Sequence, residues 1–172
     1  GGGKTTSIYT LAKELSKLGK KGVVTTTTHM HMPEDFIDFK GNVNEIIERF
    51  KSENLITVGI KDRDGKIVGG GEKIAEKLIN LCDFLLIEAD GARMHPLKAP
   101  ANYEPVILKN TTMVVGVAGI DSLFKSINKI CHRPEQVCKV LSKNYNHKIN
   151  TKDIANILGS EEGQRKNVKD CF

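Results

Sequence analysis

The stretch Gly1-Gly2-Gly3-Lys4-Thr5-Thr6 decides the fold class of this chain. Gly3, Lys4 and Thr5 match the last three defined positions of the phosphate-binding P-loop pattern G-x-x-x-x-G-K-[ST]. In that loop, backbone N–H groups cradle phosphate oxygens, the lysine reaches the β- and γ-phosphates, and the hydroxyl completes a Mg²⁺ shell. We therefore predict that a nucleotide is bound by Gly1, Gly2, Gly3, Lys4, Thr5 and Thr6. We expect the first glycine of the pattern, and the strand before it, upstream of Gly1.

A helix is expected directly after these glycines. Its apolar residues recur at helical spacing, and Gly19 stands where a C-terminal cap belongs. These apolar residues are Ile8, Leu11, Ala12, Leu15 and Leu18. The N-terminus of a helix carries roughly half a positive charge, so the loop, Lys4 and the helix would act as one anion site. The alternative is a flexible glycine-rich terminus without a ligand.

An acidic strand end is the second strong signal. The apolar run within residues 83–92 (DFLLIEADGA) is typical of a buried parallel strand, and it ends in Glu88 and Asp90. We predict Thr5, Glu88 and Asp90 as ligands of Mg²⁺, which prefers oxygen. We predict Lys4, Glu88 and Asp90 as catalytic residues, with one carboxylate orienting an attacking water or a substrate group. The alternative is that both acids only cap the strand at a solvent-exposed turn.

Residues 23–28 are rich in β-branched residues and predict another strand. Its carboxyl end would deliver Thr28 and His29 to the edge where open α/β sheets bind ligands, so we predict that both contact nucleotide, metal or substrate. His29 and His31 could offer two imidazoles to one metal, because alternate residues of a strand point the same way. A catalytic or substrate-sensing His29 is the preferred interpretation, and an exposed loop histidine without a role is the alternative.

Periodicity and turn chemistry predict the remaining elements. They are a helix over 42–50, a strand over 55–60, a hairpin turn at 62–65 with its second strand at 66–68, a glycine hinge at 69–71 into a helix around Ile74–Ile79, a strand over 113–118, a helix beginning at Pro134, and a helix capped by Thr151.

Length and composition predict one domain over residues 1–172. The chain is 39% hydrophobic and 27% charged, and it has no apolar run of roughly 20 residues, so no membrane is expected as a partner. Four cysteines without a C-x-x-C pair favour a reducing cytoplasm. The net charge is +5, and residues 121–172 hold ten Lys or Arg against six Asp or Glu. No aromatic residues interleave with these charges, so no nucleic-acid partner is expected.

Several segments together resemble a particular family. They are TTTTHM (25–30), LIEADGAR (86–93), PLKAP (96–100), EPV (104–106) and HRPE (132–135). In this order they resemble the YqeC family of selenium-dependent molybdenum hydroxylase accessory proteins. The resemblance implies a cytoplasmic P-loop protein that assists maturation of molybdenum hydroxylases at the stage of the molybdenum cofactor. A further strand would be expected beyond Phe172, and no N-K-x-D base-reading motif occurs, so the choice between ATP and GTP stays open.

Five residues of these segments are predicted as substrate or switch residues: Arg93, Lys98, Glu104, His132 and Arg133. Arg93 follows the acidic turn, and a guanidinium group matches the oxygens of a phosphate or an anionic pterin. Pro96 and Pro100 predict a rigid loop that presents His95 and Lys98, and a restrained surface crossing is the alternative. Glu104 would position a loop or bind substrate. His132 and Arg133 precede Pro134, and solvation of a helix start is the alternative for both.

The sequence therefore predicts an α/β chain with a three-layer P-loop NTPase fold, a mainly parallel sheet and a hairpin insertion. The expected function is a Mg²⁺-dependent NTPase that uses ATP or GTP in hydroxylase maturation. The alternatives are a kinase or nucleotidyl transferase acting on a pterin-like substrate, and a scaffold that holds nucleotide without turnover. The expected partners are the nucleotide, the molybdenum cofactor and a molybdenum hydroxylase, and a homodimer is a further expected assembly.

Overall fold

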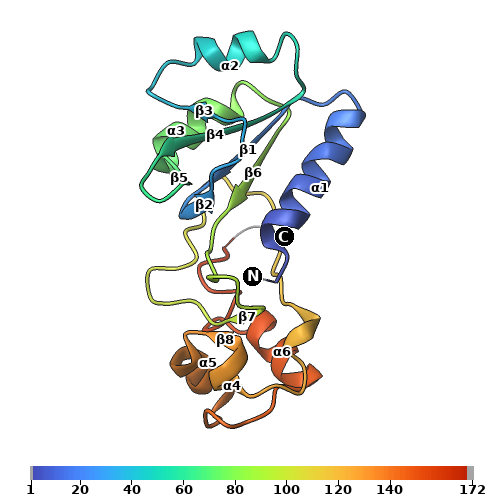
Figure 1. Cartoon of the computed structure of the whole chain (residues 1–172), viewed down its shortest axis with the longest axis vertical. Coiled ribbons are helices and arrows are strands. Elements are labelled where there is room, and N and C mark those ends of the chain that lie inside the picture. Colours follow the sequence, from blue (N-terminus) through green and yellow to red (C-terminus); the bar gives the residue numbers. More distant parts are fainter. Residues whose placement is uncertain (1, 170–172) are drawn as a thin grey trace. The chain divides into compact units, whose positions relative to one another are not determined.

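The computed structural model describes residues 2–169, so the prediction for Gly1 lies outside the described residues. The chain divides into two compact units (Figure 1). The sheet unit is Thr5–Ala89, and the helical unit is Gly1–Lys4 together with Asp90–Phe172. A single domain over residues 1–172 stays a prediction. None of the helices in the described part of the chain is long and apolar enough to cross a membrane.

The sheet unit is built on a mixed sheet with the strand order β2-β5-β4-β1-β6, in which β3 also pairs with β4. β1 pairs in parallel with β4 and β6, and β3 pairs in parallel with β4, whereas β5 is antiparallel to β2 and β4. The predicted hairpin between β4 and β5 is therefore confirmed. The strands are β1 (Gly22–Thr26), β2 (His29–His31), β3 (Ile37–Asp38), β4 (Leu55–Lys61), β5 (Lys66–Val68) and β6 (Phe84–Glu88).

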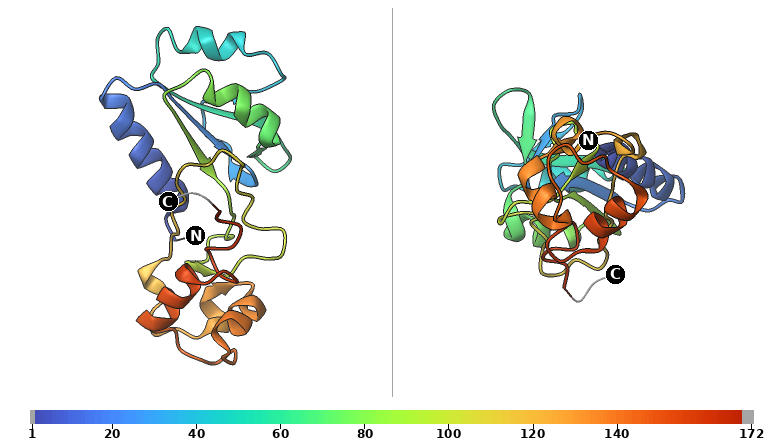
Figure 2. Two further views of the ribbon diagram at one scale, coloured as in Figure 1. Left: turned by 180° about the vertical axis from the view of Figure 1, so that it is seen from behind. Right: turned by 90° about the horizontal axis from the view of Figure 1, so that it is seen from below.

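Helices cover both faces of this sheet because successive strand residues point to opposite sides. Val23 packs in a core with Ile46 of α2 (Asn44–Arg49) and Leu78 of α3 (Gly71–Ile79). Val24, the next residue, packs with Ala12 of α1 (Lys4–Lys17). Figure 2 shows α1 and α3 apart, on the two sides of the strands. The sheet unit is thus a mixed α/β structure, and the expected helix after the glycines is present.

Gly69 is required by a close approach of two backbone segments. A Cβ atom at this position would lie 1.5 Å from the carbonyl oxygen of Thr26, so no side chain fits between them. The helix α3 begins two residues later, at Gly71. The glycine run 69–71 was predicted as a hinge. Its first residue, Gly69, also packs against the carboxyl end of β1.

The helical unit packs short helices around one core. Its elements are β7 (Leu97–Lys98), the 3₁₀ turn η1 (Ile120–Ser122), α4 (Ile127–Ile130), β8 (Cys131–His132), α5 (Pro134–Leu141) and α6 (Thr151–Gly159). The fully buried side chains of the core include Leu97, Ile127, Val137, Ile149 and Ile157. β7 and β8 pair in parallel, with Lys98 opposite His132. Pro134 begins α5, as predicted.

The strand predicted over residues 113–118 is wrong, because this segment has no strand structure. Its backbone groups find a side-chain partner instead. The N–H of Val117 donates to Oε1 of Gln164 at 3.1 Å, and its carbonyl accepts from Nε2 of Gln164 at 3.2 Å. The Gln164 carboxamide thus takes the place of a neighbouring strand, and no pattern in the sequence predicts this contact.

The predicted cap of α6 is off by one residue. Asn150, not Thr151, is the N-cap: its side chain accepts from the backbone N–H of Asp153 at 3.0 Å. The Asp153 carboxylate in turn accepts from the backbone N–H of Asn150 at 2.9 Å, which completes a capping box. Asp153 is buried and also contacts His147 Nε2 at 2.8 Å.

Asn150→Ala should therefore destabilise the protein by about 1 kcal/mol, because two N–H groups of the first turn lose their acceptor or their geometry. Thr151→Ala, one residue later and exposed, is the matched control and should change the free energy of unfolding by less than about 0.5 kcal/mol. Urea denaturation followed by circular dichroism measures both. Equal decreases in the free energy of unfolding of the two variants would contradict the assignment of Asn150 as the N-cap.

Candidate functional site

Glu88 is the central polar residue of the sheet unit. It ends β6 and is 8% exposed. Its Oε2 accepts a hydrogen bond from the Thr5 hydroxyl at 2.6 Å, although the two residues are 83 positions apart in the chain. Thr5 lies in the first turn of α1, so the helix N-terminus and the carboxyl end of β6 meet at this pair. Two hard oxygen donors side by side are the chemistry that Mg²⁺ selects.

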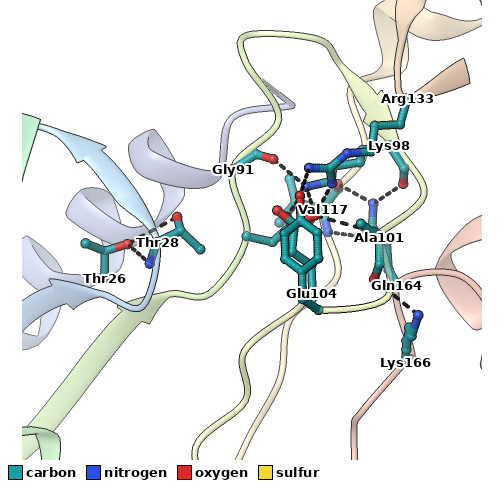
Figure 3. A network of polar contacts seen from close by, with 12 residues as sticks. Thr26, Thr28, Gly91, Lys98, Ala101, Glu104, Val117, Arg133, Gln164 and Lys166 are labelled. Atoms are coloured by element: carbon teal, nitrogen blue, oxygen red, sulfur yellow. Dashed lines mark hydrogen bonds and ion pairs between the residues drawn. The ribbon is translucent and has the colours of Figure 1, made fainter. Parts of the chain in front are cut away.

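Thr26 supports Glu88 from the neighbouring strand β1, whose register places the two residues opposite each other. The buried Thr26 hydroxyl donates to the carbonyl oxygen of Glu88 at 2.8 Å. It also accepts from the backbone N–H of Thr28 at 2.9 Å (Figure 3). The N–H of Thr27 also donates to the Glu88 carbonyl, at 3.0 Å. The predicted strand 23–28 consequently ends at Thr26, because the hydroxyl of Thr26 turns the chain at Thr28.

His29 and His31 lie on the exposed side of β2, and Met30 between them is buried. The alternation predicted from the sequence is therefore present. Nε2 of His29 lies 3.2 Å from Oδ2 of Asp62 in the hairpin turn. No group of three or more His, Cys, Asp or Glu side chains that could hold a metal ion occurs within residues 2–169. His29 thus has a carboxylate neighbour that the sequence pattern did not identify.

Tyr9 and Thr57 form a polar pair that sequence reasoning missed. The Tyr9 hydroxyl lies 3.0 Å from Oγ1 of Thr57, and burial raises the pKa of Tyr9. Both line a pocket of about 290 Å³ together with Lys13, Phe36 and Arg49. No motif marks these positions, since they come from four separate segments of the sheet unit.

The glycines of the predicted loop adopt backbone conformations that favour glycine. Gly2 has φ +65° and Gly3 has φ +87°. Lys4 is the first residue of α1, and Thr6 on the same helix is exposed. By its contacts Lys4 belongs to the helical unit, where it has a small electrostatic effect on Asp90.

Lys98 is the most buried charge of the helical unit, with 1% of the residue exposed. Its Nζ donates to a carboxylate oxygen of Asp90 and, at 2.6 Å, to the carbonyl oxygen of Gly91. The same atom lies 2.6 Å from Oε2 of Glu104. A buried ammonium group is stable only when its donors are paired, and here all three have oxygen partners (Figure 3).

The pKa values of the two carboxylates around Lys98 are shifted in opposite directions from their ordinary values. Desolvation raises the pKa of Asp90 more than the hydrogen bond from Lys98 lowers it. For Glu104 desolvation also acts upward, but the hydrogen bonds from Lys98 and Arg133 outweigh it and lower the pKa. Its two cationic partners therefore stabilise the ionised form of Glu104, whereas burial disfavours the ionised form of Asp90.

Arg133 closes the network on its other side. Its guanidinium donates to Oε2 of Glu104 and, at 2.8 Å, to the Tyr103 hydroxyl. His132, the residue before it, stacks on His95 with ring centroids 6.0 Å apart. Arg93 is exposed and makes no ion pair within residues 2–169.

The structure thus gathers the predicted site residues in two places. Thr5, Glu88 and Thr28 lie around the end of β6 in the sheet unit, where the unforeseen Thr26 joins them. The second group lies in the helical unit and consists of Asp90, Lys98, Glu104, His132 and Arg133. It also includes His95, which was predicted on the same loop as Lys98, and Tyr103, which the sequence analysis missed.

Lys98→Met should destabilise the protein by about 3–5 kcal/mol at pH 8, because it leaves the partly buried Asp90 carboxylate without its partner. The loss should shrink as the pH falls. In the variant the pKa of Asp90 rises further, so the folded state takes up a proton that the unfolded chain does not, and this uptake favours folding at low pH. Urea denaturation between pH 5 and pH 8 measures the effect.

Lys139→Met is the matched control, since Lys139 pairs with Glu162 at 3.7 Å on the surface, where both side chains are more than half exposed. It should cost less than about 1 kcal/mol. If the decrease in the free energy of unfolding of Lys98→Met did not change with pH, the ion-pair explanation would be contradicted. Lost packing of the lysine side chain would then explain the decrease.

Comparison with known proteins supplies the family. A model of the family described as "YqeC protein" matches residues 1–135. The Escherichia coli (strain K12) protein named "Uncharacterized protein YqeC" is 30% identical over 181 residues, which cover 97% of this chain and 68% of that protein. No solved structure matches. With a family match over most of its length and this relative, the chain belongs to the YqeC protein family.

Proposed function

We propose that this protein binds ATP or GTP together with Mg²⁺, hydrolyses the nucleotide, and acts in the cytoplasm as an accessory protein in the maturation of selenium-dependent molybdenum hydroxylases. The observation that carries the nucleotide site is the hydrogen bond of 2.6 Å between the partly buried Thr5 and the buried Glu88. It joins the G-K-T segment to the acidic strand end, and these are the two parts that a P-loop site needs in contact.

A three-layer P-loop NTPase fold belongs to the same proposal. Support comes from the parallel pairing of β4, β1 and β6 and from the helices on both faces of the sheet. The antiparallel β5 and β2 extend one side of this parallel centre, as a hairpin insertion would. The carboxyl ends of β1 and β6 then lie together, at the edge where such folds bind ligands.

The residues present fit Mg²⁺. A hydroxyl and a carboxylate oxygen at 2.6 Å offer only hard oxygen ligands, and nucleotide phosphates and water would supply the others. Thr5 and Glu88 would hold the ion, which when bound neutralises charge on the phosphates. Asp90 forms its ion pair with Lys98, so Glu88 takes the metal-binding role and Asp90 a positioning role. Lys4 would contact the β- and γ-phosphates.

The maturation role rests on the resemblance of the TTTTHM and EADGAR segments. A second candidate function is the transfer of a phosphoryl or nucleotidyl group to a pterin-like acceptor. It is favoured by the basic side chains that surround His132 in the helical unit, which suit an anionic acceptor.

Lys4→Ala should weaken Mg²⁺-dependent binding of ATP or GTP by about tenfold to a hundredfold, the worth of one or more charge-assisted hydrogen bonds. Isothermal titration calorimetry with each nucleotide, with and without Mg²⁺, measures this and selects the base. Lys17→Ala, an exposed lysine in the last turn of the same helix, is the control and should bind like the unaltered protein.

The products then separate the candidates. Inorganic phosphate released without a second substrate supports the NTPase, whereas phosphate or nucleotide found on a pterin supports the transferase. Tight binding without any product would indicate a scaffold. Equal affinities of the Lys4→Ala and Lys17→Ala proteins would contradict the nucleotide site itself.

A further inference from the structure

Two short strands bring an unusual set of side chains together in the helical unit. β7 and β8 pair in parallel, and their register sets Lys98 opposite His132. The His132 ring stacks on His95 at an interplanar angle of 14°. Lys98, Arg133 and Arg93 all act electrostatically on His132, so three cations lie near this ring.

The charged side chains near His132 include one more cation than anions. Lys98 and Arg133 share the carboxylates of Asp90 and Glu104, which are two anions for two cations. Arg93 is the third cation, is exposed, and has no ion pair within the described residues. One positive charge is therefore left over beside the stacked rings, which favours an anionic ligand and disfavours a metal cation.

His132 also has an unmet hydrogen-bonding requirement. Its Nδ1 atom is buried and has no hydrogen-bond partner in the described part of the chain. A buried polar atom without a partner costs free energy, and in native proteins such an atom usually meets a ligand, an ion or a water molecule. Burial and the neighbouring cations Lys98, Arg133 and Arg93 lower the pKa of His132 to about 4, so the ring is neutral at pH 7 and keeps one N–H donor.

We propose that Arg93, His95 and His132 form an oxyanion site that binds a phosphate group of a small molecule. Arg93 supplies a positive charge that has no ion pair among the described residues, and the imidazoles supply hydrogen bonds. Lys98, Glu104 and Arg133 hold the surrounding backbone and are already paired with one another. This site goes beyond the proposed nucleotide site and does not depend on Lys4 or Thr5.

Inorganic phosphate is the probe, and the histidine ring resonances of the intact protein report its position by NMR. The chain has five histidines, and His132→Gln identifies the signal of His132. Phosphate should shift the resonances of His132 and His95 and leave that of His29 in place. Bound phosphate should also raise the pKa of His132 above about 4, because an anion stabilises the imidazolium form against Lys98, Arg133 and Arg93.

Arg93→Gln should weaken phosphate binding about tenfold, the usual worth of one charge-assisted contact. Arg165→Gln removes an exposed arginine elsewhere in the helical unit and should leave the affinity unchanged. Backbone amide spectra verify that each variant is folded. Equal phosphate affinities of the Arg93→Gln and Arg165→Gln proteins, or unshifted His132 and His95 signals, would overturn the proposal.

Lys4→Ala separates this site from the nucleotide loop. If it weakens nucleotide binding while phosphate still shifts His132, two anion sites exist. If it removes the phosphate shift as well, the phosphate was bound at the loop, and the oxyanion site is wrong while the nucleotide site stands.

Discussion

Glu88 is the residue on which the geometry of the sheet unit depends, because it binds two other segments at once. Its backbone carbonyl accepts from the Thr26 hydroxyl and the Thr27 N–H, and its carboxylate accepts from Thr5. Such a buried carboxylate is costly unless donors surround it. The end of β6, the end of β1 and the start of α1 must therefore adopt one relative position. A glycine at position 69 is part of the same constraint, since its backbone presses on the Thr26 carbonyl.

Lys98 has the corresponding role in the helical unit, with the opposite sign of charge. A buried ammonium group needs three acceptors, and these come from Asp90, Gly91 and Glu104. The loop between β6 and β7 and the loop that follows β7 are thereby fixed together, and Arg133, the N-cap residue of α5, supplies the balancing cation for Glu104. Glu88 and Lys98 are thus buried side chains that each fix more than one segment, but the partners of Glu88 are distant in the sequence whereas those of Lys98 lie within eight residues of it.

The sequence predicted what local patterns encode. The helix after the glycines, the hairpin at 62–65, the strand ending at Glu88 and the start of α5 at Pro134 all follow from periodicity or turn chemistry. Residues 113–118 carry the β-branched pattern of a strand, but a strand also needs a partner, and Gln164 takes that place from 47 residues away. The contacts of Thr26 and Tyr103 were missed for the same reason, because no sequence pattern predicts which distant group a hydroxyl will bond.

The pair Glu88 and Asp90 illustrates the limit of a motif most clearly. Spacing treats the two acids alike, since they are two residues apart at one strand end. The structure gives Glu88 a neutral hydroxyl donor and gives Asp90 an ammonium group. A carboxylate that accepts from a hydroxyl keeps its negative charge available for a cation, whereas one that neutralises a buried lysine does not. The raised pKa of Asp90 adds to this difference, because protonation would remove its charge altogether. Environment, rather than position in the motif, therefore favours Glu88 over Asp90 as a ligand in the proposed Mg²⁺ site, while Asp90 pairs with Lys98.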